Sequence, residues 1–158
     1  MQIMPRVGIL HNIRSIHNVA SIFRTADAAG FDKLFLTGYT PGPIDRFGMP
    51  EQKFIKVSLG AEKNIAWEMK KNLSPLLNTL KKNGYSVVAF EQHPKALHYR
   101  TVSYQKPFAI MLGNERVGLS ARALQHADYI AQIPMRGKKE SLNVSVVAGI
   151  AFFESLID

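Results

Sequence analysis

Residues 6–37 of this chain read RVGILHNIRSIHNVASIFRTADAAGFDKLFLT. The apolar run at 6–10 is typical of a buried strand, and residues 31–37 have the composition of a second one. Between them, apolar residues recur at the spacing of an amphipathic helix, at Val19, Ile22, Phe23 and Ala26. Asn18 stands where a helix N-cap is expected, and Gly30 where the helix should end. Strand, helix and strand of these lengths predict a parallel βαβ crossover, so the fold class is α/β.

Arg24 occupies a distinct position on this predicted helix. At 100° per residue it lies roughly 140° from the centre of the apolar stripe. We therefore expect its side chain to point away from the core of its own subunit.

The α/β pattern continues after residue 37. Further strands are predicted at 85–90, 108–112 and 129–133, and helices at 73–82, 120–126 and 142–157. Residues 38–50 contain three prolines and three glycines. They should form a long loop at the carboxyl end of a strand, where open α/β sheets bind ligands. Residues 91–104 are polar and are expected to be irregular.

A basic stretch follows the long loop. It contains one aromatic residue among its lysines: Lys53, Lys56, Lys63, Trp67, Lys70 and Lys71. Two interpretations stay open. Such a stretch can bind nucleic acid through phosphate contacts and stacking, or it can be a solvated helix face whose tryptophan enters the core.

The composition of the chain limits its class. With 158 residues, of which 46% are hydrophobic, we expect one domain spanning residues 1–158. The absence of cysteine excludes disulfides, a thiolate nucleophile and cysteine-ligated zinc. Because the sequence shows neither a signal peptide nor an apolar run of membrane-spanning length, we expect a cytoplasmic protein without a membrane partner.

The net charge suggests the kind of partner. A formal charge of +8 on a chain of this size raises the local concentration of polyanions. RNA or DNA is therefore the expected partner. A positive charge that serves only solubility is the alternative.

Several common catalytic motifs are absent from the sequence. It contains no glycine-rich dinucleotide or Walker loop, no His-Glu-x-x-His motif and no Gly-x-Ser-x-Gly elbow. Three polar stretches remain, each at a junction of strand and helix: Asn18 with Arg24, 113–115 with Gly118, and 133–135 with 141–143. Taken singly, each allows a structural interpretation. Asn18 and Ser141 can be helix N-caps, Arg24 a solvent-facing charge and Glu115 a turn residue.

The closing helix at 142–157 is apolar on nearly every face. A single sheet cannot bury all of these faces, so we expect a second subunit to cover the rest. Asn143, Ser145 and Glu154 would then be buried polar groups, which need hydrogen-bond partners or a function. Val144 stands where a capping box would place Glu or Gln, which weakens the interpretation of Ser141 as a cap alone.

Three segments of the sequence resemble the three motifs of one enzyme family. They are NVASIFRT at 18–25, LGNERVGLS at 112–120, and IPM at 133–135 with SLNVS at 141–145. Their content and order resemble the SpoU (TrmH-type) RNA ribose 2′-O-methyltransferases of the SPOUT superfamily, over nearly the whole chain. One departure is Ala20, where many members have glycine or another small residue.

This resemblance implies a SPOUT-type α/β knot, which is a mostly parallel sheet flanked by helices with a C-terminal trefoil knot. It also implies S-adenosylmethionine bound in the knot, an obligate homodimer, tRNA or rRNA as the substrate, and no metal. The N-terminal RNA-binding domain of some members is expected to be missing. The minimal domain would then bind RNA unaided or through its dimer.

The resemblance also implies roles for individual residues. By position, the cofactor would be held around Leu112, Gly113, Ile133, Met135 and Leu142. The catalytic arginine of the family falls on Arg24. The other polar motif residues expected in the catalytic centre are Asn18, Glu115, Ser141 and Asn143.

The implied reaction is methyl transfer from S-adenosylmethionine to a ribose 2′-oxygen. The enzyme must align the two groups and stabilise the oxygen as it loses its proton. Because a guanidinium hardly deprotonates in a protein, we expect Arg24 to act by charge and positioning, on the cofactor site of the partner subunit. Two alternatives stay open: a non-catalytic RNA-binding or assembly factor with this fold, and a SPOUT enzyme that methylates a base nitrogen.

Overall fold

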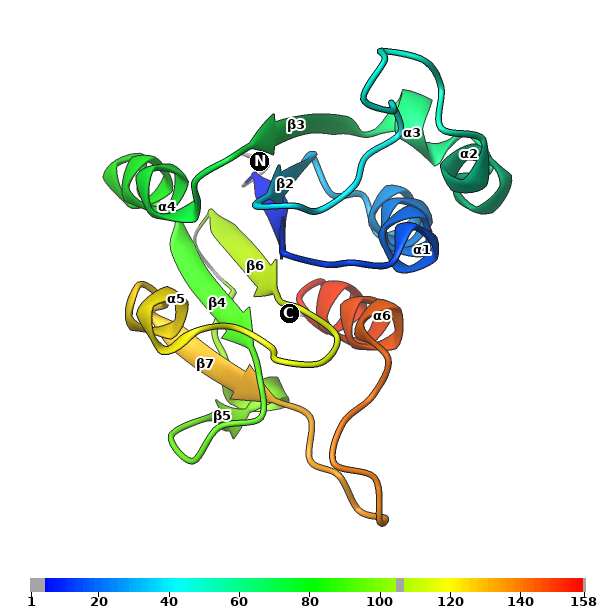
Figure 1. Ribbon diagram of the computed structural model, residues 1–158. Coiled ribbons are helices and arrows are strands. Elements are labelled where there is room, and N and C mark those ends of the chain that lie inside the picture. Colours follow the sequence, from blue (N-terminus) through cyan, green and yellow to red (C-terminus); the bar gives the residue numbers. More distant parts are fainter. Residues whose placement is uncertain (1–4, 105–106, 158) are drawn as a thin grey trace.

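A seven-stranded sheet lies between two layers of helices in the computed structural model, which describes residues 5–104 and 107–157 (Figure 1). The strands are β1 (Arg6–His11), β2 (Lys33–Thr37), β3 (Ala66–Lys70), β4 (Ser86–Phe90), β5 (Leu97–His98), β6 (Phe108–Leu112) and β7 (Tyr129–Gln132). Their order is β3-β2-β1-β6-β4-β7-β5, and each neighbouring pair is parallel. The predicted α/β class and parallel βαβ unit are confirmed.

Helices cover both faces of the sheet. They are α1 (Ile16–Ala28), α2 (Gln52–Ser58), α3 (Ala61–Asn64), α4 (Leu73–Lys82), α5 (Ala121–Gln125), α6 (Val144–Glu154) and the short 3-10 helix η1 (Tyr99–Thr101). Figure 1 shows α1, α2, α3 and α6 on one face and α4 with α5 on the other. Side chains alternate along β6 between the two cores, because Ile110 packs on the α1 side and Met111 on the α4 side. None of the helices in the described part of the chain has the length and apolar character needed to cross a membrane.

Two strands were not predicted, and both lie at an edge of the sheet. The residues of β3 are exposed or only partly buried, and Ala, Trp, Glu, Met and Lys in sequence lack the alternation that marks a half-buried strand. Its stability comes from pairing with β2 and from ion pairs of Glu68 with Lys33 and Lys70. The basic stretch therefore includes an edge strand, and Trp67 of that strand packs edge-on against Phe23 of α1.

The strand β5 comprises only two residues, within a segment that was expected to be irregular. Leu97 and His98 are both exposed and pair only with the end of β7. Two exposed residues give no hydrophobic period, so tertiary pairing alone creates this strand.

The helix α1 begins earlier than predicted. Ser15 is its N-cap and accepts a hydrogen bond from the backbone N–H of Asn18 at 3.2 Å. The prediction of Asn18 as the cap is therefore wrong, and its side chain is available for other contacts. The predicted end at Gly30 is confirmed, because Gly30 adopts a φ of 69° and its N–H donates to the carbonyl of Asp27.

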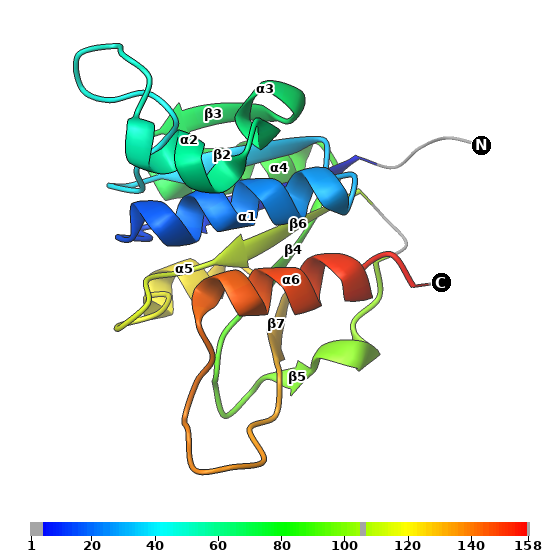
Figure 2. The ribbon, with the colours of Figure 1, turned by 90° about the vertical axis from the view of Figure 1, so that its right-hand side faces the viewer.

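The helix α6 packs against α1 and β6 and leaves part of its apolar surface uncovered. It begins after Asn143, whose side chain accepts from the N–H of Ser145, so Asn143 rather than Ser141 is the N-cap. Ala148, Ala151 and Phe152 are buried, whereas Val146 and Phe153 are 48% and 49% exposed. Figure 2 shows α1 and α6 side by side on one outer face of the molecule.

Candidate functional site

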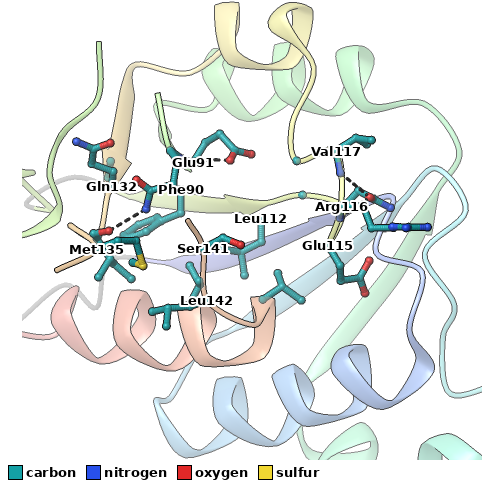
Figure 3. A pocket seen from close by; sticks show the side chains of 18 residues that line it. Phe90, Glu91, Leu112, Glu115, Arg116, Val117, Gln132, Met135, Ser141 and Leu142 are labelled. Atoms are coloured by element: carbon teal, nitrogen blue, oxygen red, sulfur yellow. Dashed lines mark hydrogen bonds between the residues drawn. The ribbon is translucent and has the colours of Figure 1, made fainter. Parts of the chain in front are cut away.

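The carboxyl ends of β6, β4 and β7 are neighbours in the sheet, and a pocket opens beside them (Figure 3). Its volume is about 780 Å³ when the open mouth is included. Its walls come from strand ends and from the start of α6: Phe90, Glu91, Gln92, Leu112, Gly113, Asn114, Glu115, Arg116, Val117, Gly118, Ala131, Gln132, Ile133, Met135, Ser141, Leu142, Val144 and Val147.

All five residues predicted to hold a cofactor line this pocket: Leu112, Gly113, Ile133, Met135 and Leu142. The first two lie where β6 ends, the next two follow β7, and Leu142 precedes α6. The sheet order explains this convergence, since β6 and β7 flank β4 and end at the same edge.

The turn after β6 forms one rigid wall of the pocket. The Oδ1 atom of Asn114 accepts hydrogen bonds from the N–H groups of Arg116 at 2.8 Å and Val117 at 3.0 Å. Gly118 closes the turn with a φ of 64°, a conformation that favours glycine. The turn is therefore fixed by its own hydrogen bonds.

A carboxylate that the sequence analysis did not single out supports this turn. Glu91, the first residue after β4, accepts a hydrogen bond from the N–H of Leu119 at 2.8 Å. Its carboxylate lies so close to Gly118 that a Cβ atom at that position would collide with it. Open α/β sheets bind ligands at the carboxyl ends of their strands, and residues 113 and 133 follow such ends. Glu91 also follows one, and its place in the site becomes clear once β4 is known to lie between β6 and β7.

Gln92, also missed from the sequence, joins the same strand end to the loop after β7. Its Nε2 atom donates to the carbonyl of Ile133 at 2.8 Å. This bond links the β4 end to the segment that carries Met135.

Glu115 connects the turn to the beginning of α1. Its Oε2 atom accepts from the N–H of Arg14 at 3.0 Å. Its Oε1 atom accepts from the N–H of Ser15 at 3.0 Å and from Nδ2 of Asn18 at 3.1 Å. Partial burial alone would raise the pKa of Glu115, but these hydrogen bonds outweigh it and lower the pKa below its ordinary value. The side chain is therefore a carboxylate at neutral pH.

Asn18 extends this network to the third motif. It is buried, with 8% of its surface exposed, and its Oδ1 atom accepts from Nδ2 of Asn143 at 3.2 Å. The Oδ1 atom of Asn143 in turn accepts from the hydroxyl of Ser145 at 2.6 Å. One chain of hydrogen bonds thus joins Asn18 to two segments that lie 97 and 125 residues further along the chain.

Two predicted catalytic residues lie outside this network. Ser141 is exposed and lines the pocket beside Leu142. Arg24 is exposed on α1 and is not among the residues that line the pocket. The predicted outward direction of Arg24 is confirmed, and the structure of a single subunit does not bring it to the other site residues.

The pocket suits a ligand with a flat apolar part and a positive charge. Leu112, Met135 and Leu142 supply apolar surface, and the carboxylates of Glu91 and Glu115 supply negative charge. Exposed backbone groups at strand ends can form hydrogen bonds with the ligand's polar edges. S-Adenosylmethionine, with an adenine ring and a cationic sulfur, has these properties.

Comparisons with known proteins agree with this assignment. A family model described as the SpoU rRNA Methylase family matches residues 6–153. A tRNA (guanosine(18)-2′-O)-methyltransferase from Thermus thermophilus is 35% identical over 147 residues, which cover 93% of this chain and 72% of that protein. A putative TrmH family tRNA/rRNA methyltransferase from Staphylococcus saprophyticus is 35% identical over 151 residues, which cover 96% of this chain and 58% of that protein.

A solved structure shows the same fold. The AdoMet-bound rRNA methyltransferase from Sinorhizobium meliloti superposes with a TM-score of 0.87 at 28% identity. The match covers 99% of this chain and 59% of that chain. Two of these three relatives therefore contain a large part that has no counterpart in this chain.

Proposed function

The chain belongs to the SpoU rRNA methylase family, and we propose that it transfers a methyl group from S-adenosylmethionine to a ribose 2′-oxygen of tRNA or rRNA. The observation that carries this proposal is the hydrogen-bonded chain Glu115–Asn18–Asn143, of which Glu115 lines the pocket. These residues come from the three motif segments, and no helix-capping role explains why a buried asparagine should join them.

The cofactor supplies an electrophilic methyl group on a positively charged sulfur. Leu112, Met135 and Leu142 would contact its apolar parts, and backbone groups at Gly113 and Ile133 would bind its polar edges. The carboxylates in the wall favour a cationic ligand over the neutral product that remains after transfer. This difference promotes both binding of the donor and release of the product.

The polar network holds the pocket in shape. Asn18 fixes the carboxylate of Glu115 and the amide of Asn143 in one orientation. Because an in-line reaction requires close alignment of donor and acceptor, small movements of these walls would slow transfer. We assign Asn18 and Asn143 to positioning, and Ser141 to contact with the bound ligands.

Arg24 is proposed to act on the site of a partner subunit. Its guanidinium would bind a phosphate of the RNA or stabilise the 2′-oxygen as negative charge develops. Support comes from its exposure on α1, the helix that packs against α6, whose apolar residues Val146 and Phe153 are about half exposed. A homodimer formed through this face would bury those residues and bring Arg24 toward a second subunit.

We also propose that the C-terminal part forms a trefoil knot, as the family resemblance implies. Its support is the path of the chain, which leaves β7 and returns to pack α6 against α1 and β6, the strand that β4 separates from β7. The pocket lies where this returning segment meets the strand ends. Since tRNA and ribosomes function in the cytoplasm, we expect the protein to act there.

The proposed activity is tested with labelled S-adenosylmethionine and total RNA from cells that lack this protein. We expect label in one RNA species with the wild-type chain. We expect Arg24→Ala to lose transfer, and Arg24→Lys to retain part of it because the charge remains. Absence of incorporation into any RNA fraction, or equal transfer by all three proteins, would contradict the proposal.

The shared site has a separate test, in which Arg24→Ala and Asn143→Ala proteins are mixed under conditions of subunit exchange. If Arg24 serves the partner's pocket, each mixed dimer contains one complete site. Random exchange then restores about 25% of wild-type activity, because half of the dimers are mixed and each has one of two sites intact. If Arg24 serves its own subunit, the mixture stays inactive.

A further inference from the structure

A second cavity lies on the other side of the turn that borders the pocket. Its volume is about 910 Å³ with its open mouth included. It is lined by Arg14, Ser15, Asn18, Tyr39, Asn114, Glu115, Arg116 and Val117. The last four also line the first pocket, so the two cavities share the turn as a common wall.

Tyr39 gives this cavity a fixed aromatic wall. Its hydroxyl accepts a hydrogen bond from Nδ2 of Asn114 at 3.0 Å, and its backbone N–H donates to Oδ1 of Asn12 at 3.2 Å. Asn12 and Gly38 both adopt positive φ angles, of 54° and 64°. A Cβ atom at Gly38 would collide with the Asn12 side chain, so the loops after β1 and β2 are in close contact. The ring is nevertheless 59% exposed, which leaves it accessible to a ligand.

The cavity also contains two arginines whose charge is not neutralised by a neighbour. Arg14 and Arg116 are exposed, and neither takes part in the ion pairs found within residues 5–104 and 107–157. The nearby carboxylate of Glu115 accepts hydrogen bonds from backbone N–H groups and from Asn18 instead. Figure 3 shows the Arg116 side chain extending away from the centre of the first pocket.

An exposed aromatic ring that shares a cavity with two arginines has the chemistry of a single-stranded nucleic-acid site. A base stacks on the ring, and phosphates on either side of it bind the guanidinium groups. A base paired in a helix cannot offer its face to such a ring, because its neighbours in the stack cover it. Apolar surface from Val117, which is 82% exposed, adds to the contact area at the rim.

We propose that this cavity binds an unpaired nucleotide adjacent to the methylated one, with its base on Tyr39 and its phosphates on Arg14 and Arg116. The proposal rests on the proposed function, since it names how the RNA substrate reaches the cofactor pocket. The shared wall places this nucleotide next to that pocket. It also predicts that the substrate presents its target in a loop or another unpaired segment.

The test measures equilibrium binding of bulk tRNA, and in a second series of ribosomal RNA, at several salt concentrations. Both RNAs come from cells that lack the protein. We expect Tyr39→Ala to bind roughly 5- to 150-fold more weakly, from the range measured for loss of one stacked base. Tyr39→Phe keeps the ring and should bind within about twofold of wild type. The Arg14→Ala/Arg116→Ala double variant should reduce the salt slope by about 1.4, the value for two phosphate contacts to a single strand.

Lys82→Ala is the charge control, because Lys82 is exposed at the end of α4, close to the start of β4 and so at the opposite edge of the sheet. It should leave the salt slope nearly unchanged. Calorimetric affinity for S-adenosylmethionine should stay at the wild-type value in Tyr39→Ala, Tyr39→Phe and Lys82→Ala, because neither residue lines the cofactor pocket. Wild-type RNA affinity in Tyr39→Ala, an equal loss in Tyr39→Phe, or a parallel loss of cofactor affinity would overturn the proposal.

These outcomes are separable from failure of the proposed function. If the wild-type chain transfers methyl groups to RNA while the Tyr39 and arginine variants bind RNA normally, only the second cavity is wrongly assigned. If the wild-type chain transfers no methyl group to any RNA, the proposed function fails and the assignment of this cavity fails with it.

Discussion

Asn18 bridges two segments of the site, although its place in the sequence suggested a helix cap. Its amide donates to the Glu115 carboxylate and its carbonyl oxygen accepts from Asn143. Asn18 is buried, and removal of its side chain would take one hydrogen-bond partner from Glu115 and one from Asn143. The effect of substitution should therefore exceed that of a surface hydrogen bond.

We predict that Asn18→Ala lowers the free energy of unfolding by about 1–3 kcal/mol, measured by urea denaturation. Asn18→Asp should be worse at pH 7, because it places a second carboxylate against Glu115, and should partly recover near pH 4. Asn64→Ala is the control, since Asn64 also donates to a carboxylate, Asp27 at 3.1 Å, but on the exposed surface. Asn64→Ala should lower the free energy of unfolding by less than about 0.5 kcal/mol. Equal losses at positions 18 and 64 would contradict a structural role for the network.

Glu115 should make stability depend on pH in the acidic range. Its pKa is lower in the folded protein than its ordinary value of 4.5, so its ionised form favours the folded state. That contribution is complete above the unfolded pKa and is lost as pH falls through the folded pKa. The Glu115→Gln variant has no carboxylate at this position, so its stability does not contain this pH-dependent contribution.

The expected measurement is the difference in unfolding free energy between wild type and Glu115→Gln. It should be constant from about pH 7 to pH 5 and shrink as the pH falls below 4.5. Glu140→Gln, in an exposed part of the loop before α6, is the matched control for the loss of one carboxylate. A difference for Glu115→Gln that is independent of pH would show that its hydrogen bonds do not favour the carboxylate.

At the scale of elements, the turn between β6 and α5 depends on glycine for two separate reasons. Gly118 adopts a positive φ, and it also lies against the carboxylate of Glu91. Gly84 adopts a similar φ of 83° but has no atom near the position of a Cβ. Comparing alanine variants at these two positions therefore separates the cost of backbone strain from the cost of a steric clash.

We predict that Gly84→Ala costs about 1–2 kcal/mol, the usual strain of a left-handed residue. Gly118→Ala should cost at least about 1 kcal/mol more, because Glu91 must move and Leu119 loses its hydrogen bond. Calorimetry should also show S-adenosylmethionine binding at least about tenfold more weakly in Gly118→Ala, or about 1.4 kcal/mol. Wild-type cofactor affinity in that variant would mean that the turn is not a binding wall.

Helices and strands with strong hydrophobic periodicity were predicted from the sequence, whereas those with weak periodicity were not. The helix α4 buries Leu73, Leu76, Leu77 and Leu80 at helical spacing and was found close to its true bounds. The edge strands β3 and β5 have no such signal, because edges bury little. The N-caps at Ser15 and Asn143 were displaced by two or three residues in the prediction, since several polar residues near each helix start can cap it.

Motif order predicted which residues line the pocket, but it did not predict the contacts between the site residues. No spacing rule relates residues 18, 115 and 143, and only the sheet order brings them together. Glu91 was missed for the same reason. Its function depends on β4 lying between β6 and β7, which is a property of the whole topology.

At the scale of the whole molecule, the uncovered face of α6 predicts association of two subunits. Phe153→Asp would place a carboxylate in that interface and cost at least about 3 kcal/mol there. We expect sedimentation to show monomers at concentrations where wild type is dimeric, with loss of methyl transfer. Leu59→Asp is the control, because Leu59 is 66% exposed at the end of α2 and does not belong to α6. A dimeric Phe153→Asp protein would exclude this face as the interface.

The central claim is that this site methylates the ribose 2′-oxygen of RNA. The most direct measurement is digestion of RNA labelled by the wild-type protein with a nuclease that needs a free 2′-hydroxyl. The account predicts that the label is recovered in nuclease-resistant dinucleotides, because a methylated 2′-oxygen cannot take part in cleavage. Label recovered in single nucleotides with a methylated base would contradict it.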